Sequence, residues 1–311
     1  MADHPQLAIE SIAGKRPYQE DSVVAEHLSD GRLLIAVADG MGGHAAGEVA
    51  SALALEALSA ALEDGEALDS AFAHANAEVH ERAREPGKQG MGTTLTAALV
   101  DDGEYFIANV GDSRGYLLTR DGIRQLTEDH SFVAEAVKRG QSRSEAEATP
   151  WRDALTRSIG TEERVQVDVY GPFPVGVDSA LLICSDGLYK VLTDDQLRHI
   201  FSQSTNARGA AQTLVATALE SGSDDNISVA IAEYGEVPRT VGQDTMTMDY
   251  APRTREDPGP VTAAAPGATR APDPTDAPGL TDAPGDTRPA MGVVIAAVVL
   301  LAAILALLVL L

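Results

Sequence analysis

The chain has 311 residues and a formal net charge of −24, with 47 acidic and 23 basic side chains. This charge argues against a nucleic-acid-binding protein, because a phosphate backbone is bound through a positively charged face. The single cysteine, Cys184, excludes a framework of disulfide bonds within the chain and is compatible with a reducing compartment.

Strand-like and helical patterns follow one another over residues 1–235, which predicts one mixed domain of α and β structure. Short apolar or alternating runs predict strands at 7–12, 22–26, 33–38, 93–100, 105–110, 115–119, 165–170, 180–184 and 227–232. Helical periodicity predicts helices at 45–62, 68–84, 131–139, 194–201 and 207–221. Hairpins are expected at Asp102-Gly103 and Asp121-Gly122. We expect an α+β fold of four layers, a sandwich of two antiparallel β-sheets flanked by helices.

The composition changes after residue 235. Residues 236–290 are dominated by Pro, Gly, Thr, Ala and Asp, and Thr-Asp-Ala-Pro-Gly occurs at 275–279 and again at 281–285, which predicts a disordered linker. Residues 291–311 contain neither a charge nor a proline, which predicts a transmembrane helix. The alternative is a buried oligomerisation helix. Arg288 favours a single-pass tail anchor in the cytoplasmic membrane, with the catalytic domain in the cytoplasm.

Two of the six Asp-Gly dipeptides follow apolar runs that are expected to be buried. They are Asp39-Gly40, after 33–38, and Asp186-Gly187, after 181–185. A carboxylate at the end of a buried strand normally needs an opposite charge or a bound cation. Further acids stand near strand ends at Glu20, Asp21, Asp112 and Asp225. The pattern predicts a metal site.

Seven short segments make the chain recognisable. They are Ala-Asp-Gly-Met-Gly-Gly at 38–43, Met-Gly-Thr-Thr at 91–94, Gly-Asp-Ser-Arg at 111–114, Leu-Thr-Glu-Asp-His at 126–130, Leu-Thr-Arg-Ser-Ile-Gly at 155–160, Cys-Ser-Asp-Gly-Leu at 184–188 and Asp-Asn at 225–226. In this order they resemble the bacterial members of the metal-dependent (type 2C) serine/threonine protein phosphatases, over residues 7–234. The resemblance implies the αββα fold. It also implies hydrolysis of phosphoserine and phosphothreonine in proteins by a metal-activated water, opposing a bacterial Ser/Thr kinase, in a catalytic domain that is monomeric.

The resemblance also implies two or three Mn²⁺ or Mg²⁺ ions. By this resemblance, Asp39 bridges two metals, Glu20 and the Gly40 carbonyl hold one of them, and Asp186 and Asp225 hold the other. Hard cations of this kind prefer such oxygen ligands.

Three further roles follow from the same resemblance. Asp21 acts through bound water, Arg16 binds the substrate phosphate, and Asp112 is the candidate for a third metal position. The alternatives are a surface ion pair for Arg16 and a turn cap for Asp112.

At several other positions this chain differs from members of the family, so the roles of those positions cannot be transferred. Met41 stands where some members have a histidine, and we expect His130 to support a loop rather than to transfer protons. Residues 131–155, called the flap segment below, have Thr149 where relatives commonly have histidine. A cysteine-dependent phosphatase would need an arginine six positions after Cys184, where this chain has Lys190, so Cys184 is expected to pack in the core.

Two other functions stay open at this point. One is an inactive phosphatase fold that serves as a membrane-tethered binding module, although none of the expected metal ligands is missing. The other is a hydrolase of small phosphate esters, which turnover on phosphopeptides compared with small metabolites would distinguish.

Overall fold

A computed structural model describes residues 5–42 and 45–235, which all belong to one unit of the chain, Met1–Arg253. The predicted linker at 236–290 and the predicted transmembrane helix at 291–311 lie outside the described residues. Across the part that is described, no helix combines the length and the apolar character needed to cross a membrane.

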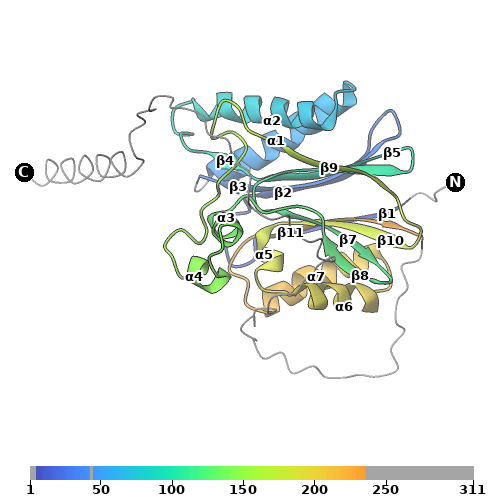
Figure 1. The fold of residues 1–311 in the computed structure, drawn as a ribbon. Coiled ribbons are helices and arrows are strands. Elements are labelled where there is room, and N and C mark those ends of the chain that lie inside the picture. Colours follow the sequence, from blue (N-terminus) through green and yellow to red (C-terminus); the bar gives the residue numbers. More distant parts are fainter. Residues whose placement is uncertain (1–4, 43–44, 236–311) are drawn as a thin grey trace, which may run out of the picture. The chain divides into compact units, whose positions relative to one another are not determined.

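Two antiparallel sheets lie face to face (Figure 1). The first sheet has the order β1 (Gln6–Ile12), β11 (Ile227–Tyr234), β10 (Ser179–Cys184), β7 (Arg114–Thr119) and β8 (Gly122–Gln125). The second has the order β2 (Asp21–His27), β3 (Leu33–Met41), β5 (Leu95–Asp101), β6 (Glu104–Val110) and β9 (Asp168–Pro174), and β4 (Gly92–Thr93) pairs with the end of β3.

Helices cover the outer face of each sheet (Figure 1). The second sheet is covered by α1 (Ala45–Glu63) and α2 (Leu68–Ala83), and the first by α5 (Asp186–Tyr189), α6 (Asp194–Gln203) and α7 (Ala207–Glu220). The flap segment contains α3 (Phe132–Lys138) and α4 (Arg143–Glu147). The predicted fold, two antiparallel sheets flanked by helices, is confirmed.

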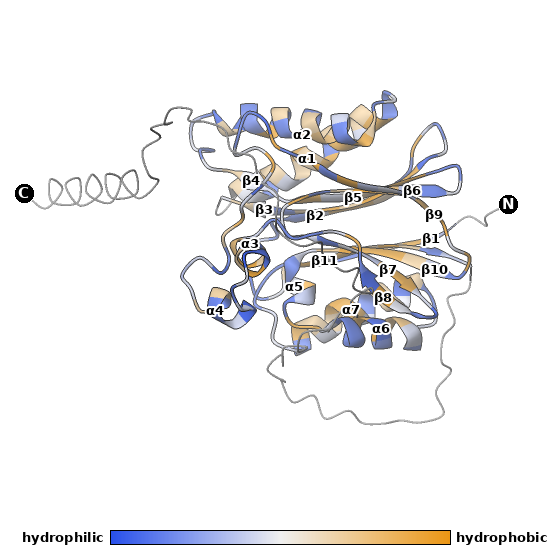
Figure 2. Cartoon of the chain, viewed as in Figure 1, coloured by the Kyte–Doolittle hydropathy of each residue, from blue (hydrophilic) through white to orange (hydrophobic). Residues whose placement is uncertain are grey.

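Alternation along the strands divides the core into three layers. In β3, Leu33, Ile35 and Val37 pack against the other sheet, whereas the residues between them pack against α1 and α2. Cys184, the last residue of β10, packs against the helices α5 to α7 that cover the outer face of the first sheet. Apolar residues line the strands and the helix sides that meet them, and polar residues lie outside (Figure 2). Both faces of each sheet are thus largely closed to water by apolar side chains.

Most of the predicted elements are present, and both predicted hairpins are confirmed. Asp102 and Gly103 both have positive φ, 44° and 78°, and connect Asp101 of β5 to Glu104 of β6, as a tight two-residue turn requires. The hairpin near Asp121 connects β7 to β8, a short strand that the sequence analysis did not predict.

The structure corrects several boundaries. The strand β3 continues through Asp39-Gly40 instead of ending at Ala38, and Asp186-Gly187 begins the short helix α5, which was not predicted. The predicted strand 93–100 is divided at Thr94, whose N–H donates to the Asp39 carbonyl (2.8 Å) and whose hydroxyl accepts from the Asp39 N–H (2.9 Å). The predicted strand 165–170 is found at Asp168–Pro174, and α4 was not predicted.

Candidate metal centre

Two carboxylates come from neighbouring strands of the second sheet. Asp21, the first residue of β2, is paired in register with Asp39 of β3. Val23 of β2 and Val37 of β3 face the space between the sheets. Asp21 and Asp39 are each two residues away from one of these valines, and side chains two apart on a strand share a face, so both aspartates face the same space. Asp21 is buried, and its Oδ2 accepts a hydrogen bond from Ser185 Oγ of the opposite sheet at 2.8 Å.

Two further carboxylates come from the first sheet. Asp186 follows β10 and Asp225 precedes β11, and because these strands are antiparallel both acids lie at the same end of the sheet. Asp186 Oδ2 is 2.6 Å from Lys190 Nζ. Asp225 Oδ2 accepts from Arg16 Nη2 at 2.7 Å, and its Oδ1 accepts from the backbone N–H of Asn226 at 2.9 Å. Each of these two acids therefore already has a cationic partner.

Glu20 and Gly40 lie where backbone segments approach closely. The Gly40 N–H donates to the Glu20 carbonyl at 3.1 Å, and a Cβ at position 40 would come within 2.2 Å of the Gly47 carbonyl oxygen. Only glycine fits this position without a shift of the backbone. The Glu20 carboxylate lies against Gly47 in α1, and the Asn226 side chain accepts from the Glu20 N–H at 2.8 Å.

The loop between β6 and β7 brings Asp112 beside α5. The Tyr189 hydroxyl donates to the Asp112 carbonyl at 2.8 Å. The Tyr189 ring is in turn covered by the Arg114 guanidinium, 3.6 Å from the ring centroid, which also forms a two-point ion pair with Asp129. This brace holds the Asp112 loop next to Asp186.

The charges of these five aspartates act on one another. Burial raises the pKa of Asp39 well above its ordinary value, and the charges of Asp21, Asp186, Asp112 and Asp225 raise it further. Burial together with the negative charges of Asp186 and Asp225 raises the pKa of Asp21 to about 7, and burial together with the charge of Asp186 does the same for Asp112. Carboxylates in this arrangement need protons or cations to lie so close together.

The donor set fits hard divalent cations. It consists of carboxylate and carbonyl oxygens, and two buried carboxylate oxygens, Asp21 Oδ1 and Asp186 Oδ1, have no hydrogen-bond partner. Within the described residues, however, no three His, Cys, Asp or Glu side chains are grouped so that they hold one ion as they stand. Asp186 and Asp225 are instead turned to Lys190 and Arg16.

Cys184 lies in the core, as predicted. It is fully buried among the apolar side chains under α5 to α7, and this burial raises the pKa of its thiol. A thiol in this position is not a nucleophile at neutral pH.

His130 supports a loop, as predicted. Its Nδ1 accepts from the Gly111 N–H at 3.1 Å, and its Nε2 donates to Asp168 Oδ2 at 3.0 Å. The backbone N–H of His130 also donates to the Gly111 carbonyl at 2.9 Å. The imidazole therefore fixes the residue that precedes Asp112.

Sequence reasoning gave no site role to Lys190, Ser185 or Asn226. Lys190 is four residues after Asp186 on a helix, a spacing that would have predicted the ion pair if α5 had been recognised. Asn226 donates to the carbonyls of Ala13 and Tyr18 and so fixes the loop that carries Arg16 and Glu20. For Ser185, no signal in the sequence indicated a contact with the opposite sheet.

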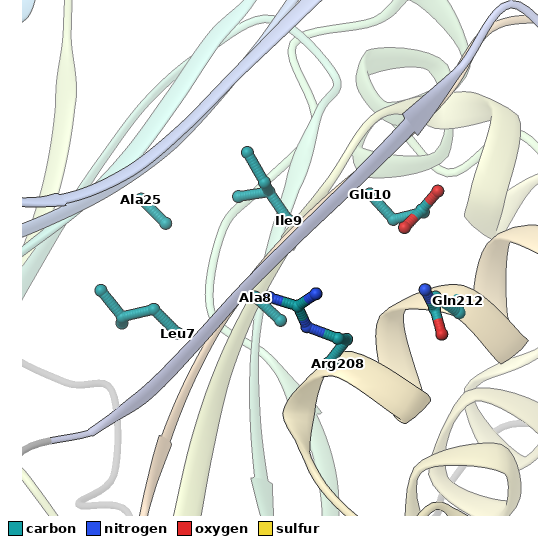
Figure 3. Close-up of a pocket in the computed structure, with 7 residues that line it drawn as sticks. All are labelled: Leu7, Ala8, Ile9, Glu10, Ala25, Arg208 and Gln212. Atoms are coloured by element: carbon teal, nitrogen blue, oxygen red, sulfur yellow. The ribbon is translucent and has the colours of Figure 1, made fainter.

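A separate pocket of about 220 Å³ lies beside β1, between β2 and α7 (Figure 3). Its lining residues are Leu7, Ala8, Ile9, Glu10, Ala25, Arg208 and Gln212. None of the candidate metal ligands lines it, so the metal centre and this pocket are different places in the fold.

Comparisons with known proteins agree with the geometry. The family model described as protein phosphatase 2C matches residues 12–221. The serine/threonine phosphatase stp of Listeria innocua is 38% identical over 230 residues, which cover 70% of this chain and 91% of the relative. The crystal structure of the Mycobacterium tuberculosis serine/threonine phosphatase PstP/Ppp is similar with a TM-score of 0.66 and 34% identity, covering 75% of this chain and 99% of that one. The catalytic domain of PstP in complex with two manganese ions is similar with a TM-score of 0.63 and 34% identity, covering 75% and 99%.

Proposed function

The chain belongs to the protein phosphatase 2C family and is a metal-dependent serine/threonine protein phosphatase, and from this premise we propose which of its residues hold the metal ions and the substrate. Enzymes of this family use Mn²⁺ or Mg²⁺. The observation that carries the proposal is the convergence of acids from both sheets at one end of the sandwich, where Ser185, directly after β10 of one sheet, donates to Asp21 of the other.

In this proposal Asp39 bridges two ions, with Glu20 and the Gly40 carbonyl on one side and Asp186 and Asp225 on the other. Ions held by these residues would supply an activated water and would offset negative charge on the phosphate. The protein fixes the backbone at Asp39 and Gly40, because Asp39 is part of a continuous strand and Gly40 is packed against two backbone carbonyls.

Asp21 and Asp112 complete the set. Asp21, held by Ser185, orients bound water, and Asp112 is the ligand for a third ion. The brace of Tyr189 and Arg114 supports this role, because it fixes the Asp112 loop beside Asp186.

Arg16 binds the substrate phosphate. Its side chain is 48% exposed at the edge of the centre, and a guanidinium matches phosphate oxygens in a bidentate manner. In the described structure it pairs with Asp225, which places the guanidinium next to an expected metal ligand. The Arg16→Ala variant should therefore raise KM for a phosphopeptide about tenfold while metal binding is retained. Loss of metal binding in this variant would overturn the role.

The test of the whole proposal is turnover with defined ions. The enzyme should hydrolyse p-nitrophenyl phosphate and phosphothreonine peptides only with Mn²⁺ or Mg²⁺, and EDTA should abolish the reaction. The matched control is Cys184→Ser, which should stay active because the thiol is buried. A preference for small phosphate metabolites over phosphopeptides would favour the hydrolase of small esters, and no turnover at all would favour the inactive binding module.

The substrates are proteins that a Ser/Thr kinase of the same cell has phosphorylated, and the catalytic domain acts as a monomer.

We further propose that residues 1–235 form the catalytic domain, 236–290 a linker and 291–311 a membrane anchor. This part rests on the sequence alone, since residues 291–311 carry neither charge nor proline. Truncation after Glu236 should release the domain from membranes with unchanged kcat. Full-length protein in the supernatant of a detergent-free fractionation would contradict the anchor.

A further inference from the structure

Lys190 lies between the candidate metal centre and the flap segment. Its Nζ is 2.6 Å from Asp186 Oδ2 and 3.5 Å from Asp153 Oδ1. The Lys190 side chain is 43% exposed, whereas the Asp186 side chain is only 12% exposed. Lys190 is thus the solvent-facing partner of a largely buried carboxylate.

Asp153 belongs to the base of the flap segment. Its neighbour Ala154 accepts a backbone hydrogen bond from Phe132 at 2.8 Å, where the segment begins. Ser131 and Leu155 form a single β-bridge at the same place. The carboxylate that Lys190 reaches on this side therefore stands where the two ends of the flap segment meet.

The Lys190 ammonium group lies between the carboxylates of Asp186 and Asp153, so its positive charge is attracted from both sides. A divalent ion on Asp186 would stand close to this ammonium group, and the two positive charges would repel each other. Of the two carboxylates that Lys190 contacts, Asp153 is the one that is not an expected metal ligand.

We propose that Lys190 is a positioning residue that competes with the metal ion for Asp186, and that Asp153 in the flap segment receives Lys190 when the ion binds. Metal affinity is then set partly by how readily Lys190 leaves Asp186. The occupancy of the metal centre is also linked to the base of the flap segment. The inference rests on the proposed role of Asp186 as a metal ligand.

The test is Mn²⁺ binding to the full-length chain in detergent, with free Mn²⁺ measured by electron paramagnetic resonance. The Lys190→Met variant should bind the more weakly held ion about tenfold more tightly, because the competing charge is gone. The Lys190→Arg variant keeps the charge and should stay close to the wild type. The matched control is Lys138→Met, which removes the same charge from a lysine paired with Glu128 and should leave binding unchanged.

A second substitution tests the link to the flap segment. The Asp153→Asn variant should weaken Mn²⁺ binding about threefold, because the displaced Lys190 loses its other partner. In the Lys190→Met background the same substitution should have no effect. This non-additivity distinguishes a role through Lys190 from a direct effect of the Asp153 charge on the ion.

The possible failures can be told apart. Unchanged Mn²⁺ affinity in Lys190→Met, an equal gain in Lys138→Met, or an equal effect of Asp153→Asn in both backgrounds would overturn the inference. The Asp186→Asn variant checks the premise. If it binds Mn²⁺ with full affinity and stoichiometry, the assignment of Asp186 as a ligand fails instead.

Discussion

The two halves of the metal centre differ in how their charges are balanced. On the first sheet, Asp186 pairs with Lys190 and Asp225 pairs with Arg16. On the second sheet, Asp21 accepts from the neutral Ser185, and within the described residues neither Asp21 nor Asp39 has an ion pair. One half therefore carries its own cations, whereas the other depends on protons or on ions from solution.

This difference indicates what each half contributes. On the first sheet, Lys190 and Arg16 offset the charges of Asp186 and Asp225. The second-sheet acids are held close together by backbone pairing between β2 and β3, so the strands impose a like-charge contact that an added cation relieves.

The largest effect is expected from Asp39→Asn, which removes the proposed bridging charge from the half that has no cation of its own. Activity on a phosphothreonine peptide should fall at least about a thousandfold, because both ions lose a ligand. Steady-state kinetics with saturating Mn²⁺ measures this loss, and circular dichroism checks that the fold persists. Activity within about tenfold of the wild type would contradict the proposed role of Asp39 as a metal ligand.

The next effect separates two neighbouring acids on the first-sheet side. Asp225→Asn should lower kcat about a hundredfold, because it removes a proposed metal ligand that is also the partner of Arg16. Asp224→Asn should change kcat less than about threefold, since Arg16 contacts only the backbone carbonyl of Asp224. Equal losses in the two variants would mean that the wrong neighbour has been assigned.

The pH dependence of Mn²⁺ binding tests the second-sheet half. Because the pKa of Asp21 is raised to about 7, a proton competes with the ion below that pH, and affinity should fall up to about tenfold for each pH unit. The Asp21→Asn variant should reduce this dependence between pH 5 and 7, and the remaining part is expected from Asp112, whose pKa is also raised to about 7. An unchanged slope in the variant would show that other groups take up the proton.

The raised pKa of Asp21 also predicts how the stability of the metal-free protein in EDTA depends on pH. Whereas Mn²⁺ affinity should increase with pH, this stability should decrease. The folded pKa of Asp21 lies above its unfolded value near 4, so the folded state binds more protons between these values. Stability without metal should therefore decrease as the pH rises from about 4 to about 7.

The smallest effect is on stability without metal, and its sign should differ between the two halves. At pH 8 in EDTA, Asp39→Asn should raise the free energy of unfolding by about 1 kcal/mol, because it removes a repelled buried charge. Asp186→Asn should lower it by about 1 kcal/mol, because Lys190 loses its partner. Urea unfolding measures both, and the same sign in both variants would contradict the comparison.

The strands and long helices could be predicted because their patterns are local. The continuous apolar run of β3 and the many alanines and leucines of α1 reflect burial directly. The strand β9 was misplaced because Pro172 and Pro174 argue against a strand, yet β9 lies at a sheet edge, where proline is tolerated. The short helix α5 was missed because Asp-Gly is ordinarily a turn signal.

The family resemblance named the acids that the structure brings to one end of the sandwich, but their hydrogen-bond and ion-pair partners could not be predicted. From the sequence, Lys190 was notable only because a cysteine-dependent phosphatase would need an arginine at this position. Its pairing with Asp186 depends on a four-residue helix. The contacts of Asp153 with Lys190 and of Ser185 with Asp21 join residues 37 and 164 positions apart. Such contacts depend on tertiary packing, and no local sequence pattern predicts them.

The pairing of β1 with β11 has a consequence for how the enzyme is made. The first and last strands of the described domain are neighbours, and β11 also lies between β1 and β10. During synthesis β1 emerges early and has no partner until more than two hundred residues later, when β11 is complete. The centre has the same property, because Arg16 and Asp225 come from these two ends. A nascent chain that stops before β11 therefore lacks the strand that pairs with both β1 and β10, and also Asp225, the partner of Arg16 and a proposed metal ligand.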